Sequence, residues 1–80
     1  MIALNQIDEA YPYGLSLTQV EIMRALCAGR TIEGAGLVVG LSKHTTADYV
    51  KSIYRKMRVC DRASMAVKAE RAGLLVGVEV

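Results

Sequence analysis

The sequence has no tryptophan and no phenylalanine, so tyrosine is its only aromatic residue type. Hydrophobic residues nevertheless make up 52% of the 80 residues, and alanine, leucine and valine supply most of them, which suits small helices that pack closely. A chain of this length forms one domain at most and buries only about 60% of its unfolded surface. The apolar excess therefore predicts that a second copy or a partner covers part of the surface.

The scarcity of cysteine and histidine argues against a metal centre. Cys27, Cys60 and His44 are too few and too far apart in the sequence for a tetrahedral zinc site, so we expect no metal and no cofactor. The two cysteines are expected to be free thiols in a reducing compartment, with a single disulfide as the alternative. No residues suggest a nucleophile with its base, so we expect a protein that is not an enzyme.

Targeting and membrane-spanning segments are also lacking. The N-terminus has neither a basic start nor a long apolar core, so we expect no secretory signal peptide. No stretch approaches the roughly 18 apolar residues of a membrane span. Together these features predict a cytoplasmic protein that does not enter a membrane.

Acidic residues are scarce in one quarter of the chain. Residues 43–62 contain six basic and two acidic residues, a net charge of +4, whereas the rest of the chain contains four basic and six acidic residues, a net charge of −2. The overall charge of +2 therefore conceals a cationic segment. Such a segment attracts polyanions, which makes 43–62 the first candidate for a binding surface.

Proline and glycine mark where helices stop. A proline and a glycine interrupt the acidic lead-in 1–16, so no long helix is expected there. The first long helix is expected to begin at Thr18, whose hydroxyl and the Glu21 side chain would form a capping box. Gly29 is expected to end this helix.

The second helix has the weakest sequence signal. Residues 32–39 include Gly34 and Gly36, and each glycine within a helix costs about 1 kcal/mol relative to alanine. Either these glycines allow a neighbouring helix to approach closely, or the segment is only partly helical. The following Gly40-Leu41-Ser42 predicts a tight turn, in which Ser42 caps the next helix.

The third expected helix, from Lys43 to about Arg58, has two different faces. One face is apolar and repeats at helical spacing, whereas another is cationic. The apolar face consists of Val50, Ile53, Tyr54 and Met57, and the cationic face consists of Lys51, Arg55 and Arg58. This pattern predicts a helix that packs on its own domain with one side and presents charge to a partner with the other.

A fourth helix is expected over residues 62–72. Asp61 would cap its start, and Gly73 would end it. Lys56 of the third helix and Arg62 of the fourth are expected to pair with Glu21 or Asp61 and so to hold helices together.

A helix, a short helix, a tight turn and a long basic helix follow the order of a helix-turn-helix motif. The pieces that carry a family resemblance are Leu17-Thr18-x-x-Glu21, Ala28-Gly29, Gly40-Leu41-Ser42-x-x-Thr45, Ile53-Tyr54-Arg55-Lys56-Met57-x-Val59-x-Asp61-Arg62, and Ala69 ahead of Ala72-Gly73-Leu74-Leu75. In this order the sequence resembles the LuxR-type (GerE-like) helix-turn-helix domains of bacterial transcription regulators. The resemblance implies an all-α, four-helix domain over 17–75, with 1–16 as an N-terminal extension and 76–80 as a C-terminal tail.

The resemblance also implies double-stranded DNA as a partner and a homodimer on two half-sites. The first two turns of the third helix would read bases, and the turn serine and threonine would hold phosphate. The residues expected to contact DNA are Ser42, Lys43, His44, Thr45, Thr46, Ala47, Asp48, Lys51 and Arg55. The fourth helix would form the dimer contact, for which we expect Met65, Val67, Lys68 and Arg71.

Three positions have a second interpretation. His44 is expected to contact DNA, and its alternative is a solvated residue of the first turn. Tyr49 either bonds a phosphate with its hydroxyl or packs its ring in the core. Arg58 is far down the helix, where DNA contact and simple solvation fit equally well.

The sequence departs from the family pattern in the recognition segment. Where the family usually has Thr-Val-Lys-x-His, this chain has Thr45-Thr46-Ala47-Asp48-Tyr49. The lost cation lowers non-specific DNA affinity, while Asp48 suits a cytosine amine and Ala47 suits a thymine methyl. We therefore expect a stand-alone, sequence-specific transcription regulator. The alternative is a protein-interaction module that keeps the fold and binds a second regulator through its fourth helix and apolar tail.

Overall fold

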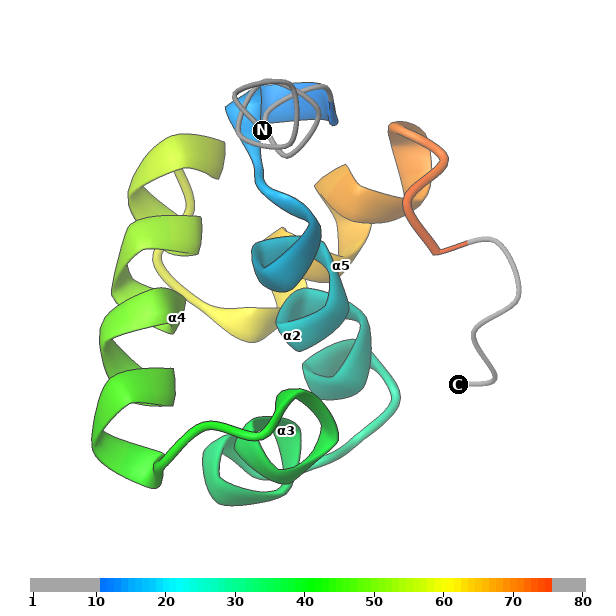
Figure 1. Ribbon diagram of the computed structural model, residues 1–80. Coiled ribbons are helices and arrows are strands. Elements are labelled where there is room, and N and C mark those ends of the chain that lie inside the picture. Colours follow the sequence, from blue (N-terminus) through cyan, green and yellow to red (C-terminus); the bar gives the residue numbers. More distant parts are fainter. Residues whose placement is uncertain (1–10, 76–80) are drawn as a thin grey trace.

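The computed structural model describes residues 11–75, and helices are the only regular structure in this part of the chain. The expected all-α, four-helix fold is confirmed for the described residues. The extension before residue 11 and the tail 76–80 lie outside them. The elements are the 3-10 turn η1 (Pro12–Gly14) and the helices α2 (Leu17–Cys27), α3 (Ile32–Val39), α4 (Lys43–Met57) and α5 (Arg62–Arg71) (Figure 1).

Helix α2 has a different cap from the expected one. Ser16 is the N-cap residue: its hydroxyl accepts the amide of Gln19 at 3.2 Å, and the Gln19 side-chain oxygen accepts the amide of Ser16 at 2.9 Å. This reciprocal pair is a capping box. The predicted box of Thr18 and Glu21 is therefore wrong, and the helix begins one residue earlier.

The segment just before α2 belongs to the same core as the helices. Leu15 is fully buried, and Tyr11 packs against the core cluster. Leu15 precedes the Ser16 cap, and Val20 one turn later is also buried, which is the spacing of a hydrophobic staple. The packed unit thus includes residues that the sequence had placed in the extension 1–16.

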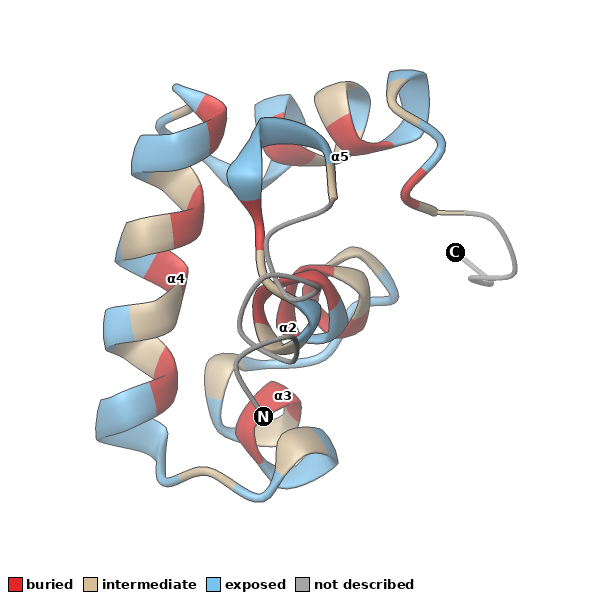
Figure 2. Ribbon diagram, turned by 45° about the horizontal axis from the view of Figure 1, so that its top comes forward, coloured by how far each residue is buried: buried red, intermediate tan, exposed pale blue. Residues whose placement is uncertain are grey.

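Helix α2 contacts each of the other three helices (Figure 1). Its inner residues Ile22, Met23 and Leu26 are almost fully buried. Figure 2 shows the buried positions of the four helices turned toward the middle of the domain. Fully burying an aliphatic side chain contributes about 1.5–3 kcal/mol, so these three residues of α2 contribute substantially to the stability of the domain.

The weak second helix forms over its expected range, as α3, with Thr31 as its cap. Gly36 lies against α4, where a Cβ atom would overlap with Thr46 and lie 2.7 Å from the carbonyl oxygen of Leu41. Close approach of a neighbouring helix is therefore the explanation for Gly36. The turn after α3 can then bring α4 back across it at short range.

The ends of the last two helices agree with the sequence to within one residue. Ser42 caps α4, which ends at Met57, and Arg58 follows in the left-handed conformation with φ of 59°. Asp61 caps α5 as expected. The chain leaves α5 through Gly73, whose φ of 77° is the glycine-favoured region that stops a helix.

Candidate nucleic-acid interface

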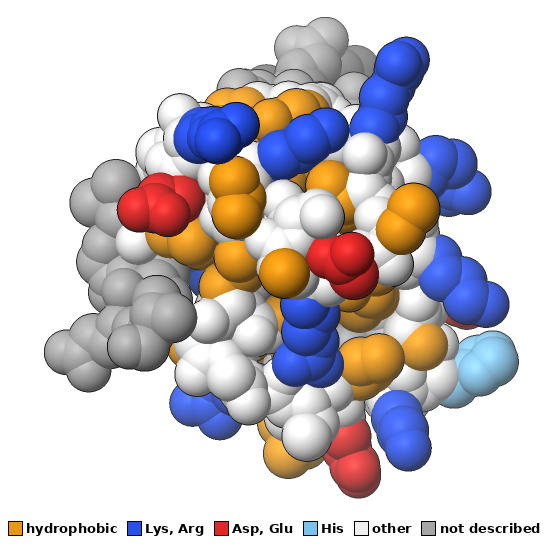
Figure 3. Space-filling model, turned by 180° about the vertical axis from the view of Figure 1, so that it is seen from behind, with side chains coloured by type: hydrophobic (Ala, Val, Ile, Leu, Met, Phe, Trp, Pro, Cys, Tyr) orange, Lys and Arg blue, Asp and Glu red, His pale blue; other side chains and the backbone are white. Residues whose placement is uncertain are grey.

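One face of α4 is exposed along its whole length. Each residue on it follows the previous one by three or four positions, so the face is a row about 20 Å long. The row, here called the outer face of α4, consists of His44, Asp48, Lys51, Arg55 and Arg58, all of them exposed. In Figure 3, Lys and Arg side chains project along the edge of the molecule that carries the His side chain.

The opposite face of α4 is buried and holds the helix on the domain. Val50, Ile53 and Met57 are part of the core. Thr46, one turn before Val50 on this face, is fully buried, and its hydroxyl donates to the carbonyl of Ser42 at 2.7 Å. The prediction that Thr46 contacts DNA is therefore wrong, because its side chain faces α3 instead of solvent.

The start of α4 presents polar groups to solvent. Ser42, Lys43, His44 and Thr45 are all exposed. The hydroxyl of Ser42 accepts the amide of Thr45 at 3.2 Å and donates to the hydroxyl of Thr45 at 3.1 Å, which holds the first turn in place. First-turn amides without helical partners and the helix dipole both attract anions, so this end of α4 suits a phosphate group.

His44 and Asp48 lie next to each other on the outer face. Their Nε2 and Oδ2 atoms are 4.0 Å apart, and the side chains are 92% and 63% exposed. A pair as exposed as this contributes little to stability, and it is an ion pair only when the imidazole is protonated. Both groups are open to a partner: the imidazole as donor or acceptor, and the carboxylate as an acceptor.

Ala47 and Tyr49, the other two residues of the recognition segment 45–49, are half-buried. Tyr49 packs against the core cluster, which agrees with the core interpretation of this residue. Ala47 lies beside the outer face and adds only a methyl group there. A partner can therefore come close to the helix backbone at Ala47.

A buried amide that sequence reasoning missed holds α4 on α2. Gln19 is only 5% exposed, and its Nε2 donates to the hydroxyl of Ser52 at 3.0 Å. Its Oε1 accepts the Nζ of Lys56 at 3.1 Å. Buried polar groups that are fully hydrogen-bonded favour one relative position of the elements they join. Gln19 therefore supports the orientation in which the outer face is presented.

Lys56 joins helices as expected, but with different partners. Its Nζ donates to the carbonyl of Gly14 at 2.9 Å in addition to Gln19. Among the described residues neither Lys56 nor Arg62 forms an ion pair with Glu21 or Asp61, so those predicted pairs are wrong. Two uncharged oxygens of the neighbouring segment take their place.

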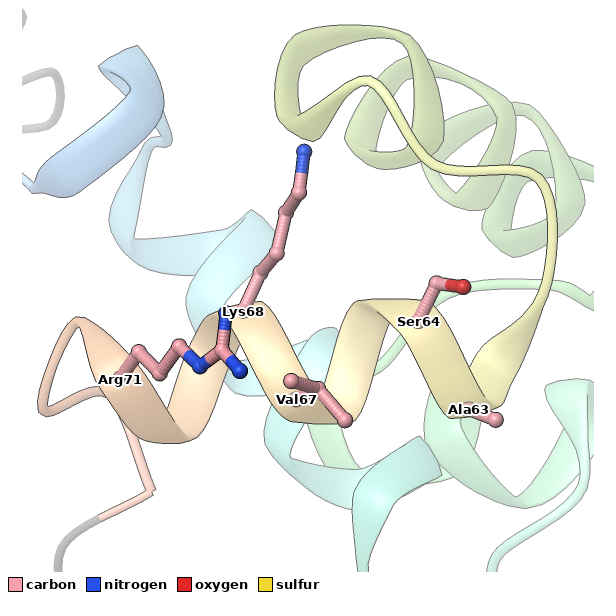
Figure 4. A pocket seen from close by; sticks show the side chains of 5 residues that line it. All are labelled: Ala63, Ser64, Val67, Lys68 and Arg71. Atoms are coloured by element: carbon pink, nitrogen blue, oxygen red, sulfur yellow. The ribbon is translucent and has the colours of Figure 1, made fainter.

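A shallow groove of about 320 Å³ runs along the exposed side of α5 (Figure 4). It contains three of the four residues expected at the dimer contact, together with two small residues one turn earlier that sequence reasoning missed. Val67, the largest apolar residue there, is 47% exposed. The lining residues are Ala63, Ser64, Val67, Lys68 and Arg71.

Met65 is not part of this groove. It is fully buried in the core, as is Ala69 one turn later, so these residues form the inner face of α5. The prediction that Met65 belongs to the dimer contact is therefore wrong, because a second copy cannot reach it without opening the domain.

Lys68 connects the groove to the end of α4. Its Nζ donates to the carbonyl of Met57 at 2.9 Å and to that of Arg58 at 3.4 Å. Figure 4 shows the Lys68 side chain rising from α5 toward that turn. A cation at the last carbonyls of a helix also interacts favourably with the negative end of the helix dipole.

Two side chains within residues 11–75 have shifted pKa values. The amide of Ser64 donates to the carboxylate of Asp61 and lowers the pKa of Asp61 below its ordinary value of 3.8. Burial raises the pKa of the Cys27 thiol above 9.0, and the positive charge of Arg62 partly opposes this. Cys27 and Cys60 are both free thiols. Because burial favours the neutral thiol, Cys27 acts as a packing group.

Over residues 11–75, no group of three or more His, Cys, Asp or Glu side chains is arranged to hold a metal ion. No helix in the same range has the length and apolar character needed to cross a membrane.

The resemblance to LuxR-type domains rests on the quoted motif residues and on the order of the helices. No protein-family model, no curated protein and no solved structure matches this chain. Membership of that family therefore stays a prediction.

Proposed function

We propose that this chain is a sequence-specific, DNA-binding transcription regulator that acts in the cytoplasm as a homodimer and has no catalytic activity. One observation carries the proposal: the outer face of α4 is cationic, exposed over its whole length, and uncovered by any other described element. If α4 had turned its charged side toward its own domain, this would have argued against nucleic-acid binding.

The dimensions of α4 suit the DNA major groove. The groove is about 12 Å wide and admits one α-helix. A helix of 15 residues such as α4 is about 22 Å long, enough to follow the groove past several base pairs. In this arrangement the exposed first turn, with Lys43 and His44, faces base edges, while Lys51 and Arg55 lie near phosphates.

Asp48 and Ala47 are the residues proposed to select the sequence. An acidic side chain in the major groove accepts a hydrogen bond from a cytosine amine, and it repels a misplaced phosphate. The methyl of Ala47 fits beside a thymine methyl. The loss of a cation at this point lowers affinity for DNA of any sequence, so specific contacts make up a larger share of the binding energy.

The groove on α5 is the proposed contact between two copies. Val67 lies on its exposed side, and Arg71 lies one turn further on. Two such chains related by a two-fold axis would present their α4 helices to half-sites about 34 Å apart. The operator is then expected to be a palindrome with that spacing.

Selection of bound duplexes from a random DNA pool tests this function. We expect enrichment of a two-fold-symmetric site, and we expect the double variant Lys51→Glu with Arg55→Glu to enrich nothing. The matched control is Arg62→Glu, because Arg62 opens α5 and acts on Cys27 of α2 instead of belonging to the outer face. A pool without enrichment by the unaltered chain would contradict the proposal.

Exposed aliphatic residues favour one other candidate function, a protein-interaction module that binds a second regulator. Leu37 and Val38 of α3 are 77% and 52% exposed, and Val67 of α5 is also open. Exposed aliphatic side chains such as these three can bury apolar surface in a contact with another protein. This candidate predicts tight binding to a protein partner together with no DNA binding even at low salt.

A further inference from the structure

Arg58 is the exception among the helix ends of this domain. The other three helices are each followed by a glycine with positive φ: Gly29, Gly40 and Gly73. After α4 the same left-handed position is taken by Arg58, with φ of 59° and ψ of 51°. A Cβ atom makes this conformation unfavourable, whereas glycine adopts it freely. A glycine at position 58 would therefore give a more stable turn.

The turn holds Arg58 in this conformation through several independent bonds. The amide of Arg58 donates to the carbonyl of Arg55 at 3.2 Å, and the amide of Val59 donates to that of Tyr54 at 3.0 Å. From α5, the Nζ of Lys68 donates to two successive backbone carbonyls, those of Met57 and Arg58. A strained residue persists where its surroundings determine it in this way, and such residues concentrate at functional sites.

The Arg58 side chain itself has no structural task in the described part of the chain. It is exposed, and no ion pair or hydrogen bond joins its guanidinium to residues 11–75. It comes directly after the last residue of α4, three positions after Arg55, so it adds a third positive charge at the C-terminal end of the outer face. The packing of Val59 against the core and the hydrogen bonds of the turn explain the left-handed conformation, but they do not explain why arginine and not glycine stands at position 58.

We propose that Arg58 is a DNA phosphate contact at the end of the site opposite Ser42, and that its left-handed backbone directs the guanidinium to that phosphate. This inference rests on the proposed function. The chain carries an unfavourable backbone conformation because the side chain needed there binds the ligand. Arginine suits the role, since its planar group donates two parallel hydrogen bonds to a phosphate.

The variant Arg58→Gly relieves the strain and removes the charge together, and two measurements report on them separately: melting temperature on the strain and DNA binding on the charge. We expect its melting temperature to rise by about 4–8 °C. We expect its affinity for a random-sequence DNA duplex to fall roughly tenfold at low salt. We also expect the slope of log K against log salt to become shallower by about one unit, as for the loss of one phosphate contact.

Two further variants control for the charge and for its position. Arg58→Lys keeps the charge and should keep the wild-type salt slope, whereas Arg62→Ala removes an equal charge from α5 and should leave the slope unchanged. If the unaltered chain binds DNA and Arg58→Gly leaves its slope and affinity as they were, this inference is overturned and the proposed function stands. If the unaltered chain shows no salt-dependent binding, both are overturned.

Discussion

Gly36 of α3 lies directly against Thr46 of α4, closer than any side chain at position 36 would permit. We expect Gly36→Ala to lower the free energy of unfolding by about 1–3 kcal/mol, because the added methyl forces the two helices apart. This loss should occur although alanine is intrinsically the better helix former by about 1 kcal/mol. Urea unfolding of the purified chain measures it.

Gly34 provides the matched control within the same helix. A Cβ atom there would meet only side-chain atoms, Thr31 Oγ1 at 3.3 Å and Arg30 Cβ at 3.6 Å. We expect Gly34→Ala to be neutral or to stabilise the domain by up to about 1 kcal/mol, because only the close contact with Thr31 offsets the higher helix propensity of alanine. Equal stabilities of the two alanine variants would show that close approach is not what requires Gly36.

The buried amide of Gln19 should matter more than its place in a helix suggests. Gln19→Leu keeps most of the volume but removes the hydrogen-bond partner of Ser16, Ser52 and Lys56. We expect a loss of about 1–3 kcal/mol in the free energy of unfolding, measured by chemical denaturation. Gln19→Glu keeps the oxygen acceptor and should lose much less; similar losses in both variants would contradict the role given to these hydrogen bonds.

The sequence predicted the helix order well because several local signals agree. The Ser42 and Asp61 caps, the glycines that end helices and the two faces of α4 are each recognised from residues a few positions apart in the sequence. Such short-range signals need no knowledge of the tertiary structure. The error at α2 arose where two overlapping capping boxes fit the sequence, and the burial of Gln19 decided between them.

The site residues were predicted less accurately because a motif does not say which side chains face inward. Thr46 continues the apolar row of α4 one turn before Val50, and Met65 shares a face with Ala69. Both patterns were visible as helical spacing. The hydrogen bonds from Lys56 to Gly14 and Gln19 join distant parts of the chain through uncharged groups, for which no sequence spacing gives a signal.

A charge within the α5 groove should separate two copies. We expect Val67→Asp to give a monomer with unchanged helix content, since Val67 is exposed in the groove. Met65→Asp should instead unfold the domain, because it places a carboxylate in the core. Sedimentation and circular dichroism distinguish these results. If the Val67→Asp chain still has the mass of a dimer, the groove on α5 is not the contact between two copies.

Acid should destabilise the fold through Asp61. Its pKa is lowered in the folded state by the amide of Ser64, so the ionised carboxylate stabilises the fold above 3.8, the ordinary value. This contribution is lost as the pH falls below 3.8 through the lowered folded-state pKa. We expect Asp61→Asn, which can still cap the helix, to reduce the dependence of melting temperature on pH in this range. An unaltered acid profile would contradict the assignment.

The salt dependence of DNA binding tests the central claim most directly, namely that the outer face of α4 neutralises phosphates. The slope of log K against log salt is about −0.9 for each phosphate neutralised. The account predicts a steep negative slope for the unaltered chain and a slope shallower by about two units per bound chain in the double variant Lys51→Gln with Arg55→Gln. Binding whose slope is unaffected by these two changes, or no binding at low salt, would contradict it.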